Sequence, residues 1–228
     1  MAAIDQVIDT AEDGDYIASQ TGFAEYDDGY WEGSIERLIP GEGYLYKSVT
    51  EKNLSFNMTD VAHSRRALRH SSDREQSIDI HAYPNTMNMT AKIYRNEQEM
   101  PGDMYHVYAF AGNEMRGISE YVGSNHYLTV YGSEDAEITF IVESLTTGET
   151  FLSNETLRFR DDVVGSRKSP YILHIGSATG IESLTDNGRP MTVYSLEGIL
   201  ISCNATLKAL RKLPKGVYIV NGQKCFIK

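Results

Sequence analysis

The most regular pattern of apolar and polar positions lies between residues 107 and 143, where apolar side chains recur at every second residue. The alternating positions are Leu128, Val130, Ile138, Phe140 and Val142. A period of two is that of a half-buried β-strand. Asn113 and Gly132 stand where chain reversals are needed. The stretch therefore predicts three antiparallel strands, with Leu128, Val130, Ile138 and Phe140 in the core.

The same alternation extends to both sides of this stretch, over residues 78–175. Upstream, the alternating apolar residues are Met87, Met89, Ala91 and Ile93. Downstream, they are Leu157 and Phe159 in one predicted strand and Tyr171, Leu173 and Ile175 in the last one. Seven short strands over about a hundred residues, separated by turns, are typical of an immunoglobulin-like β-sandwich. We predict that fold for residues 78–175.

Residues 1–56 are predicted to form a separate, small β module. Helical spacing is shown by Ile4, Val7, Ile8 and Ala11, which predicts one short amphipathic helix over residues 3–12. Short strands follow, and Asp28-Gly29 is a typical hairpin turn between two of them. The aromatic residues of this module are Tyr16, Phe23, Tyr26, Tyr30, Trp31, Tyr44, Tyr46 and Phe56.

Trp31, with Tyr30 and Tyr44, is the candidate ligand-binding site of the module. Aromatic rings on a surface can stack on a sugar or pack against a peptide. The alternative is that these rings form the core, because a module of about 55 residues must bury its few large side chains. Packing is the commoner role of such residues, so ligand binding is the second hypothesis for all three.

Residues 185–228 predict a small C-terminal β-sandwich, in which Asn221-Gly222 forms a type I′ turn. A module of about 40 residues is marginal alone, so we expect it to pack on the central domain or to use a disulfide. Its basic side chains are Lys208, Arg211, Lys212, Lys215, Lys224 and Lys228. We expect these charges to protect the sheet edges from strand addition. Linkers are predicted at residues 57–77 and 176–184.

Charge is unevenly distributed along the chain, whose formal net charge is −11. Residues 1–50 hold eleven acids and two bases, a net charge of −9, and residues 186–228 hold two acids and seven bases, a net charge of +5. An acidic majority disfavours nonspecific nucleic-acid binding. A basic cluster in the first linker comprises His63, Arg65, Arg66, Arg69, His70 and Arg74. It lacks interleaved aromatic residues, so we interpret it as solvated linker and predict no nucleic-acid partner.

Targeting and membrane segments are not evident in the pattern. No apolar run approaches the ~18 residues of a spanning helix, so we predict no membrane span. The first twenty residues carry five acids and neither Lys nor Arg, which is not the pattern of a signal peptide.

Candidate chemistry is sparse. The chain has no motif of a zinc protease, a serine hydrolase, a P-loop or a dinucleotide-binding fold, so we predict no catalytic residue, metal or cofactor. Glu114 and Arg116 are interpreted as an exposed ion pair. The acidic segment at residues 9–15 does not match a calcium-binding loop, because the third ligand position would be Ala11 and the twelfth Gln20. The acidic turns at residues 27–28 and 161–162 are interpreted as solvated. Cys203 and Cys225 either pair in an oxidising compartment or remain buried thiols.

Several ordered segments resemble a known arrangement of domains. The run DGDYIASQTGFAEYDDGYWEGSIERLIPGEGYLYKS resembles a repeat found in large secreted and cell-surface proteins of Bacteroidetes. HAYPNTMNMTA, AFAGNEMRGISEY, YLTVYG and DDVVGSRKSPYIL resemble the immunoglobulin-like domain that follows it there. MTVYSLEGILI and LPKGVYIVNGQKCFIK are similar to the C-terminal sorting-type domain of the type IX secretion system. Together these segments cover nearly the whole chain.

The resemblance implies a secreted or cell-surface location and supplies no catalytic residues. It also implies that the chain is the C-terminal part of a larger protein. The first hypothesis is therefore a non-enzymatic module that presents, anchors or exports a larger protein. Its expected partners are a cell-surface glycan, a protein or the secretion machinery. The second hypothesis is a carbohydrate-binding module that uses Trp31, Tyr30 and Tyr44. An enzyme with an unrecognised site is the third, and the oligomeric state is left open.

Overall fold

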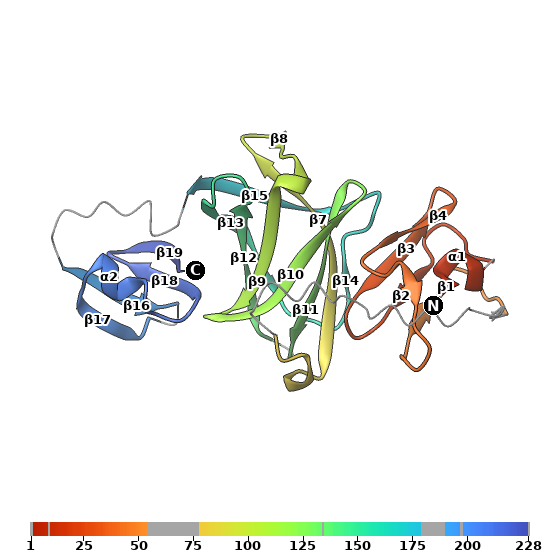
Figure 1. The fold of residues 1–228 in the computed structure, drawn as a ribbon, viewed down its shortest axis with the longest axis horizontal. Helices are drawn as coiled ribbons and strands as arrows, with labels where there is room; N and C mark the ends of the chain where they lie inside the picture. The colour runs from red at the N-terminus through yellow and green to blue at the C-terminus, as the bar shows by residue number, and fades with distance from the viewer. Residues whose placement is uncertain are drawn as a thin grey trace. The chain divides into compact units, whose positions relative to one another are not determined.

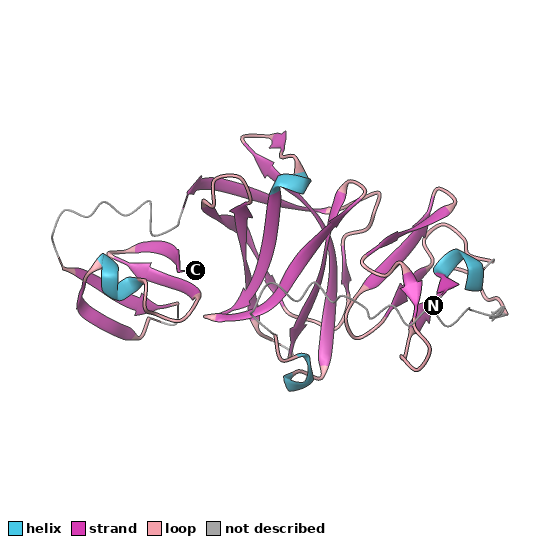
Figure 2. Cartoon of the chain, viewed as in Figure 1, coloured by secondary structure: helices cyan, strands magenta, loops and turns pink. Residues whose placement is uncertain are grey.

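The computed structural model describes residues 2–8, 10–53, 78–133, 135–178, 190–196 and 198–227. These residues form mainly β-strands (Figures 1 and 2), which confirms the predicted all-β class. The chain divides into two compact units, Met1–Ala82 and Tyr83–Lys228. The predicted linker at 57–77, with its basic cluster, lies outside the described residues, as does most of the linker at 176–184. Among the described residues, no helix has the length and apolar character needed to cross a membrane.

The N-terminal unit, Met1–Ala82, is built on a four-stranded antiparallel sheet in the order β4-β3-β2-β6. Its elements are β1 (Ala2–Ala3), α1 (Ile4–Val7), β2 (Tyr16–Ala18), β3 (Phe23–Asp27), β4 (Tyr30–Gly33), β5 (Arg37–Leu38), β6 (Leu45–Lys47) and the 3₁₀ helix η1 (Ile80–Ala82). Ile4, Val7 and Ile8 are buried against Ile17 and Ala24 of the sheet. The apolar spacing of the N-terminal segment therefore predicted the correct buried face.

The predicted helix at residues 3–12 is shorter in the structure, where α1 covers Ile4–Val7 only. Ile8 already leaves the helical conformation, with φ −119° and ψ 94°. No basic residue lies in the last turn to offset the helix dipole. A single turn holds few hydrogen bonds of its own, so packing of the apolar side chains is what stabilises it. The Asp28-Gly29 turn is confirmed, since both residues have the positive φ of a type I′ turn, 52° and 86°.

The central part of the second unit is a barrel-like sheet. Its elements are β7 (Asn85–Arg95), β8 (Gln98–Glu99), η2 (Gly102–Met104), β9 (Tyr105–Ala111), β10 (Glu114–Val122), β11 (Asn125–Gly132), β12 (Glu137–Ser144), β13 (Thr150–Arg158), β14 (Val163–Val164) and β15 (Tyr171–Ala178). Seven strands follow one another in the order β7-β11-β10-β9-β12-β13-β15, and β15 pairs with β7 to close the ring. We call these seven strands the barrel. The short strands β8 and β14 add to β7.

Two strands make the corners of the barrel by changing partner along their length. In β10, residues 114–118 pair with β9 and residues 119–122 pair with β11. In β15, residues 171–174 pair with β7 and the later residues pair with β13. Such switches join two packed sheets into one closed sheet. A Cβ atom on Gly117 would lie 2.8 Å from the carbonyl oxygen of Thr129, so glycine is required for the close approach at the first corner.

The predicted core residues lie inside this barrel. Leu128, Val130, Ile138 and Phe140 are each 0% exposed. Phe159, Leu173 and other residues of the predicted alternating strands belong to the same cluster. The assignment of strand faces from the period of two is therefore confirmed. The strand order is barrel-like and does not by itself confirm the immunoglobulin-like sandwich.

The stretch at 107–143 contains parts of four strands, β9 to β12, where three were predicted. The extra reversal lies at Gly123-Ser124, between β10 and β11. Gly123 has a φ of 60°, a conformation that glycine adopts without a steric penalty. The prediction placed turns at Asn113 and Gly132 only, so that β10 and β11 were predicted as one continuous strand.

The C-terminal sheet, residues 190–227, has four strands in the order β17-β16-β18-β19. Its elements are β16 (Met191–Ser195), β17 (Leu200–Ala205), α2 (Leu207–Leu210), β18 (Gly216–Val220) and β19 (Gln223–Ile227). One face packs against Leu210 of α2, which is 0% exposed. The described residues thus form one sheet covered by a helical turn, whereas a two-sheet sandwich was predicted. Asn221 and Gly222 have φ values of 49° and 83°, which confirms the type I′ turn.

The C-terminal sheet packs on the barrel through an apolar contact, as its small size predicted. Val217 and Phe226 form one buried cluster with Phe110 and Ile141 of the barrel. The ring of Phe226 lies edge-on to Phe110, with 5.4 Å between centroids. The alternative of a disulfide is not realised: Cys203 is exposed, Cys225 is buried, and no bond joins the two.

Candidate functional site

Trp31 and Tyr30, two of the three predicted ligand-binding residues, are neighbours on β4 and so point to opposite faces of the sheet. Trp31 packs with the apolar cluster of the N-terminal unit. Its ring is edge-on to Tyr26 at 5.3 Å and to Tyr46 at 6.1 Å between centroids. Its indole Nε1 is buried and has no hydrogen-bond partner among the described residues. Tyr30 is 50% exposed.

Tyr44, the third predicted residue, packs against the same apolar cluster as Trp31. Its hydroxyl accepts a hydrogen bond from the backbone N–H of Ile39 at 2.8 Å and donates one to the Glu42 carboxylate at 3.1 Å. Burial and the neighbouring Glu42 raise the pKa of Tyr44. The structure therefore brings Trp31 and Tyr44 to one apolar cluster and leaves Tyr30 on the other face of the sheet.

The most highly connected polar group of this unit is Asp15, whose side chain is fully buried. The Lys52 ammonium lies 2.7 Å from its Oδ2 atom, and the Tyr46 hydroxyl donates to the same oxygen at 2.5 Å. Further hydrogen bonds come from the Ser48 hydroxyl and from the backbone N–H groups of Val49 and Glu12. We call this set the Asp15 cage. It ties the start of β2 to the chain that follows β6.

The cage fixes Asp15 in its charged form. Burial alone would raise the pKa of Asp15, but the hydrogen bonds from Lys52, Tyr46, Val49 and Glu12 outweigh burial and hold that pKa far below its ordinary value. Burial and the Asp15 charge in turn raise the pKa of Tyr46. A carboxylate this fully paired has no free lone pair for a substrate, so its role is to hold the unit together.

A second acidic group lies beside the Asp28-Gly29 turn. Asp13, Asp27 and Asp28 each offer a carboxylate oxygen, and these oxygens lie within 4.8 Å of one another. Asp27 is 3% exposed, while the other two are exposed. A hydrogen bond from the Gly14 N–H to the Tyr26 carbonyl oxygen brings the two acidic turns together. Exposed carboxylates often gather without a cation, so this geometry by itself does not assign a metal.

Inside the barrel, sequence reasoning missed a buried histidine. His126 is 1% exposed, and its Nδ1 atom lies 3.2 Å from the Ser119 hydroxyl oxygen, which accepts the Val107 N–H at 2.8 Å. Its Nε2 atom is buried without a hydrogen-bond partner among the described residues. Burial, with a smaller contribution from His106, lowers the pKa of His126 to about 4. His126 is therefore a neutral core residue at physiological pH.

A second histidine, His174, forms a polar group with Glu155 at the seam between β13 and β15. The Glu155 carboxylate accepts the His174 backbone N–H at 2.7 Å and lies 2.7 Å from its Nδ1 atom. The Ser153 hydroxyl donates to the same carboxylate at 2.5 Å. Burial would raise the pKa of Glu155, but hydrogen bonds from Ser153 and His174 lower it. The Glu155 carboxylate thus accepts the His174 backbone N–H, which would otherwise need a partner in the β-ladder, at the point where β13 and β15 diverge.

The pair of Glu114 and Arg116, predicted to be an exposed ion pair, has a packing role. Its ion pair spans 3.0 Å, but the Arg116 side chain is only 12% exposed. The guanidinium carbon lies 3.8 Å above the ring of Tyr83, and the Tyr83 hydroxyl donates to Glu114. The ion pair is confirmed, and its cation is more buried than predicted because it stacks on an aromatic face.

Among the missed groups, only the acidic turns left a signal in the sequence. Asp13-Gly14 and Asp28-Gly29 are two acidic turns in one short module, and each was considered separately. Comparison of the chain with family models, curated proteins and solved structures finds no match. The geometry of its own residues is therefore what supports a function.

Proposed function

We propose that this chain is a non-enzymatic, multi-module part of a secreted or cell-surface protein, which presents, anchors or exports a larger protein. The proposal includes an immunoglobulin-like fold for the barrel. In support of it, β10 and β15 change pairing partner along their length, as strands do where two packed sheets are joined. It also includes the sorting-type reading of the last residues.

The observation that carries the proposal is the construction of the C-terminal sheet. It has an apolar core of its own, which includes Val193, Val220 and Ile227. It also meets the barrel through a limited contact centred on Phe226. A small module with a core of its own can be recognised as a unit by a secretion machine. The segments that resemble a sorting-type domain lie in its strands.

Export from a Bacteroidetes host tests this proposal directly. The full chain, preceded by a signal peptide, is compared with a truncation that lacks residues 191–228, in cells with and without a working type IX system. Surface delivery is measured as accessibility to added protease. We expect delivery of the full chain only in cells with the working system, and none of the truncated chain.

A matched variant separates sorting from stability, because the truncation also uncovers Phe110 and Ile141. Phe226→Ser opens the same contact while keeping the core of the C-terminal sheet. Export that survives Phe226→Ser and fails on truncation supports sorting. If Phe226→Ser and the truncation reduce export equally, loss of barrel stability alone explains the result. If the truncated chain is exported as well as the full chain, the proposed sorting function is rejected.

Carbohydrate binding is the second candidate, and the exposure of Tyr30 favours it. Tyr30 pairs with Asp27 across the β3–β4 hairpin, so an exposed ring lies close to the carboxylates of the Asp28-Gly29 turn. Carboxylates beside an aromatic face suit the hydroxyls and the apolar face of a sugar ring. Isothermal titration calorimetry against a glycan panel measures binding directly, because Trp31 lies on the face of the sheet opposite Tyr30. Tyr30→Ala should remove the binding and Leu45→Ala should keep it; no binding of the unmodified chain to any glycan of a broad panel rejects this candidate.

A further inference from the structure

The outer face of the C-terminal sheet, opposite α2, is apolar in two adjacent rows. The first row contains Val217 and Phe226, which pair across β18 and β19 and are buried against the barrel. The second row contains Leu200, Tyr194 and Ile219, which pair across β17, β16 and β18, and it ends on β19 at Lys224, the partner of Ile219. The barrel covers the first row only. The second row continues the same apolar surface beyond that contact.

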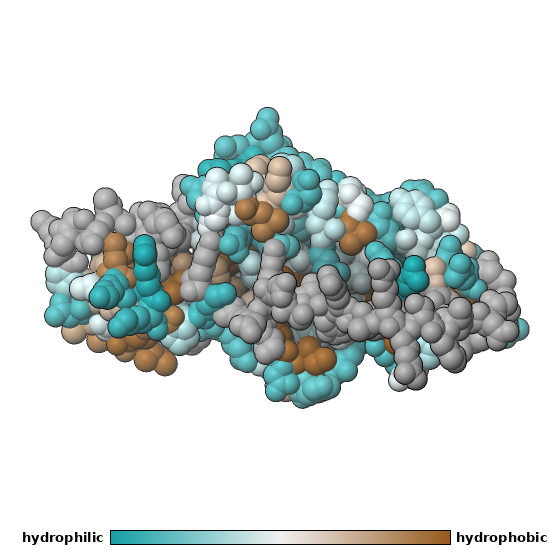
Figure 3. Space-filling view, viewed as in Figure 1, coloured by the Kyte–Doolittle hydropathy of each residue, from teal (hydrophilic) through white to brown (hydrophobic). Residues whose placement is uncertain are grey.

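The exposure of the second row is large for apolar side chains. Leu200 is 52% exposed and Tyr194 is 36% exposed. The neighbours of Leu200 add to the same end of the sheet, with Ile199 at 66% and Ile201 at 40%. Figure 3 shows hydrophobic side chains gathered in the region where Figure 1 labels β17. A contiguous apolar patch of this kind marks an interaction surface more often than chance exposure.

A β-bulge explains why consecutive residues share this surface. The pairing of β16 with β17 shifts between Val193 and Tyr194, so that Ile201 is an extra residue between the partners of the two. A bulge of this type lets Leu200 and Ile201 depart from the strict alternation of faces. The local change of register thus places several apolar side chains together at this end of the sheet, and it leaves Ile201 without a register partner on β16.

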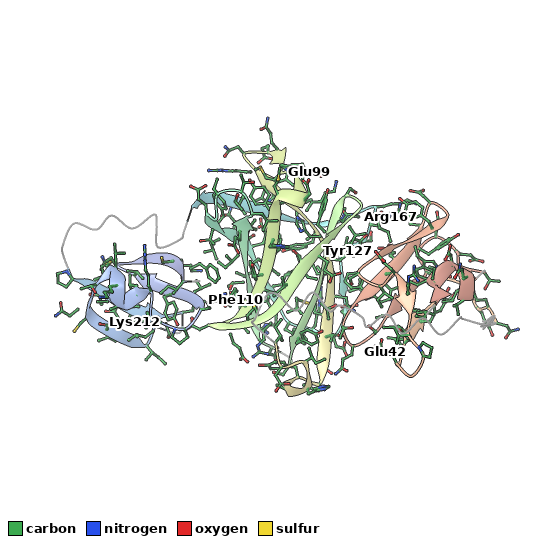
Figure 4. All side chains as sticks on the ribbon, viewed as in Figure 1. Glu42, Glu99, Phe110, Tyr127, Arg167 and Lys212 are labelled. Carbon is green, nitrogen blue, oxygen red and sulfur yellow. The ribbon has the colours of Figure 1, made fainter. Side chains whose placement is uncertain are left out.

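Strand β17 is also an edge strand without charge. It is the first strand in the order β17-β16-β18-β19, and its sequence, LISCNA, has no charged residue. The prediction that basic residues protect the sheet edges is therefore wrong for this edge. Lys224 lies on β19, and Lys208, Arg211, Lys212 and Lys215 lie on α2 and the turn after it. Figure 4 shows Lys212 on the C-terminal module.

From these observations we propose that the chain self-associates through this surface, with the β17 end of one C-terminal sheet packed against the β17 end of a second copy. Ile199, Leu200, Ile201 and Tyr194 of each copy form the contact, so the apolar surface that begins at the barrel continues across both copies. A two-fold contact places identical residues opposite each other. It brings together two uncharged edges, and no like charge of β17 opposes the contact.

The distribution of basic residues favours a second copy over a lipid surface. Membrane-surface binding works best when basic side chains flank the apolar ones. Here α2 packs on the inner face of the sheet through Leu210, and most of the basic residues accompany it. They lie on the far side of the sheet from Tyr194 and Leu200, whereas Lys224 lies on the apolar face, beside Ile219 and away from the β17 edge.

Sedimentation of the full chain over a concentration series tests the proposal. We expect a reversible dimer, and we expect Leu200→Ser/Ile201→Ser to weaken its association by at least about tenfold, as loss of central apolar contacts does. Leu45→Ser is the matched control, because Leu45 is 70% exposed in the N-terminal unit. Circular dichroism checks that each variant remains folded.

The single exposed thiol supplies an independent readout. Of the two cysteines, Cys203 on β17 is exposed and Cys225 is buried, so a bismaleimide cross-linker should join two copies through Cys203. Cys203→Ser should abolish the cross-link and keep the sedimenting dimer.

Three outcomes overturn the proposal. The first is a chain that stays monomeric at every concentration. The second is a dimer that Leu200→Ser/Ile201→Ser leaves unchanged, which places the contact elsewhere. The third is a monomer that binds phosphatidylglycerol vesicles through Leu200 and Ile201, which makes lipid the occupant of this surface.

Discussion

The N-terminal unit and the barrel are stabilised in different ways. The barrel encloses a cluster of fully buried apolar side chains, among them Met87, Leu128 and Phe140. The described residues of the N-terminal unit include fewer buried apolar side chains and place a buried charge, Asp15, among five hydrogen-bond donors. This part of the unit thus relies on a polar cage, which is directional and depends on charge.

The stability of a polar cage responds to mutation and to pH in ways that the stability of an apolar core does not. Apolar packing is insensitive to pH and loses stability in proportion to the volume removed. A buried ion pair adds little net stability compared with an apolar replacement, but the loss of one partner is costly because the other charge is left buried. The two regions should therefore respond differently to size changes, charge changes and pH.

The largest effect is expected in the barrel core. Phe140→Ala removes a ring that is 0% exposed and should lower the free energy of unfolding by about 3–5 kcal/mol. Hydrogen exchange of the amides of β9 to β12 measures this loss, and the N-terminal unit is read separately by the fluorescence of Trp31. A loss below about 1 kcal/mol would show that Phe140 is not packed in the core.

A comparable effect is expected in the Asp15 cage from a change that removes almost no volume. Asp15→Asn leaves the Lys52 ammonium, which is 11% exposed, without its closest partner. We expect a loss of about 3 kcal/mol, at the low end for a broken buried pair, because Glu12 remains 3.7 Å from Lys52. Urea unfolding followed by Trp31 fluorescence measures it. An unchanged midpoint would mean that the cage is not a source of stability.

The two regions should also lose stability in different pH ranges. The pKa of His126 is lowered from 6.5 to about 4 on folding, so the unfolded chain binds the proton more tightly between these values. Barrel stability should then fall as the pH decreases from 6.5 towards 4, by about 2 kcal/mol at pH 5. His126→Gln should remove this pH dependence of barrel stability, as measured by hydrogen exchange at pH 6.5 and at pH 5. The same slope in the variant would assign it to other groups.

For the N-terminal unit the sign is that of a carboxylate with a lowered pKa. Asp15 contributes stability above its ordinary pKa of 3.8, and this contribution is lost as the pH falls below that value. The fluorescence of Trp31 should therefore report a folded N-terminal unit at pH 5. Unfolding of this unit above pH 5 that Asp15→Asn does not alter would contradict this assignment.

The smallest effect is expected at a surface ion pair of the barrel. Arg158 and Asp135 lie 3.4 Å apart, but their side chains are 78% and 80% exposed. Arg158→Ala should change the free energy of unfolding by less than about 0.5 kcal/mol in thermal or urea denaturation. A larger loss would show that exposed pairs matter here as much as the Asp15 cage, which would remove the contrast between the two regions.

The period of apolar residues predicted strand faces well because it reflects a local rule. Leu128 and Val130 must lie on the same side of any strand that contains them, whatever that strand pairs with. The turns at Asp28-Gly29 and Asn221-Gly222 were predicted for the same reason, since their backbone conformation is set by the two residues themselves.

Strand order and polar clusters were beyond this local rule. Closure of the barrel depends on pairing Tyr171 with Ala91, and nothing in either segment specifies the other. The Asp15 cage joins residues 15 and 52, which approach only after β2 and β6 pair. The candidate site shows the same limit, because Trp31 and Tyr30 were read as one platform although the alternation of β4 separates them.

The parallel pairing of β15 with β7 also determines when the barrel can form. Partners such as Tyr171 and Ala91 are 80 residues apart in the sequence, and pairing across such a loop carries an entropic cost that slows folding. During synthesis, β7 and β13 each keep an open edge until β15 has emerged. These two edges are therefore the ones that can pair with a wrong strand, and a chaperone that acts on this protein would have to cover them during that interval.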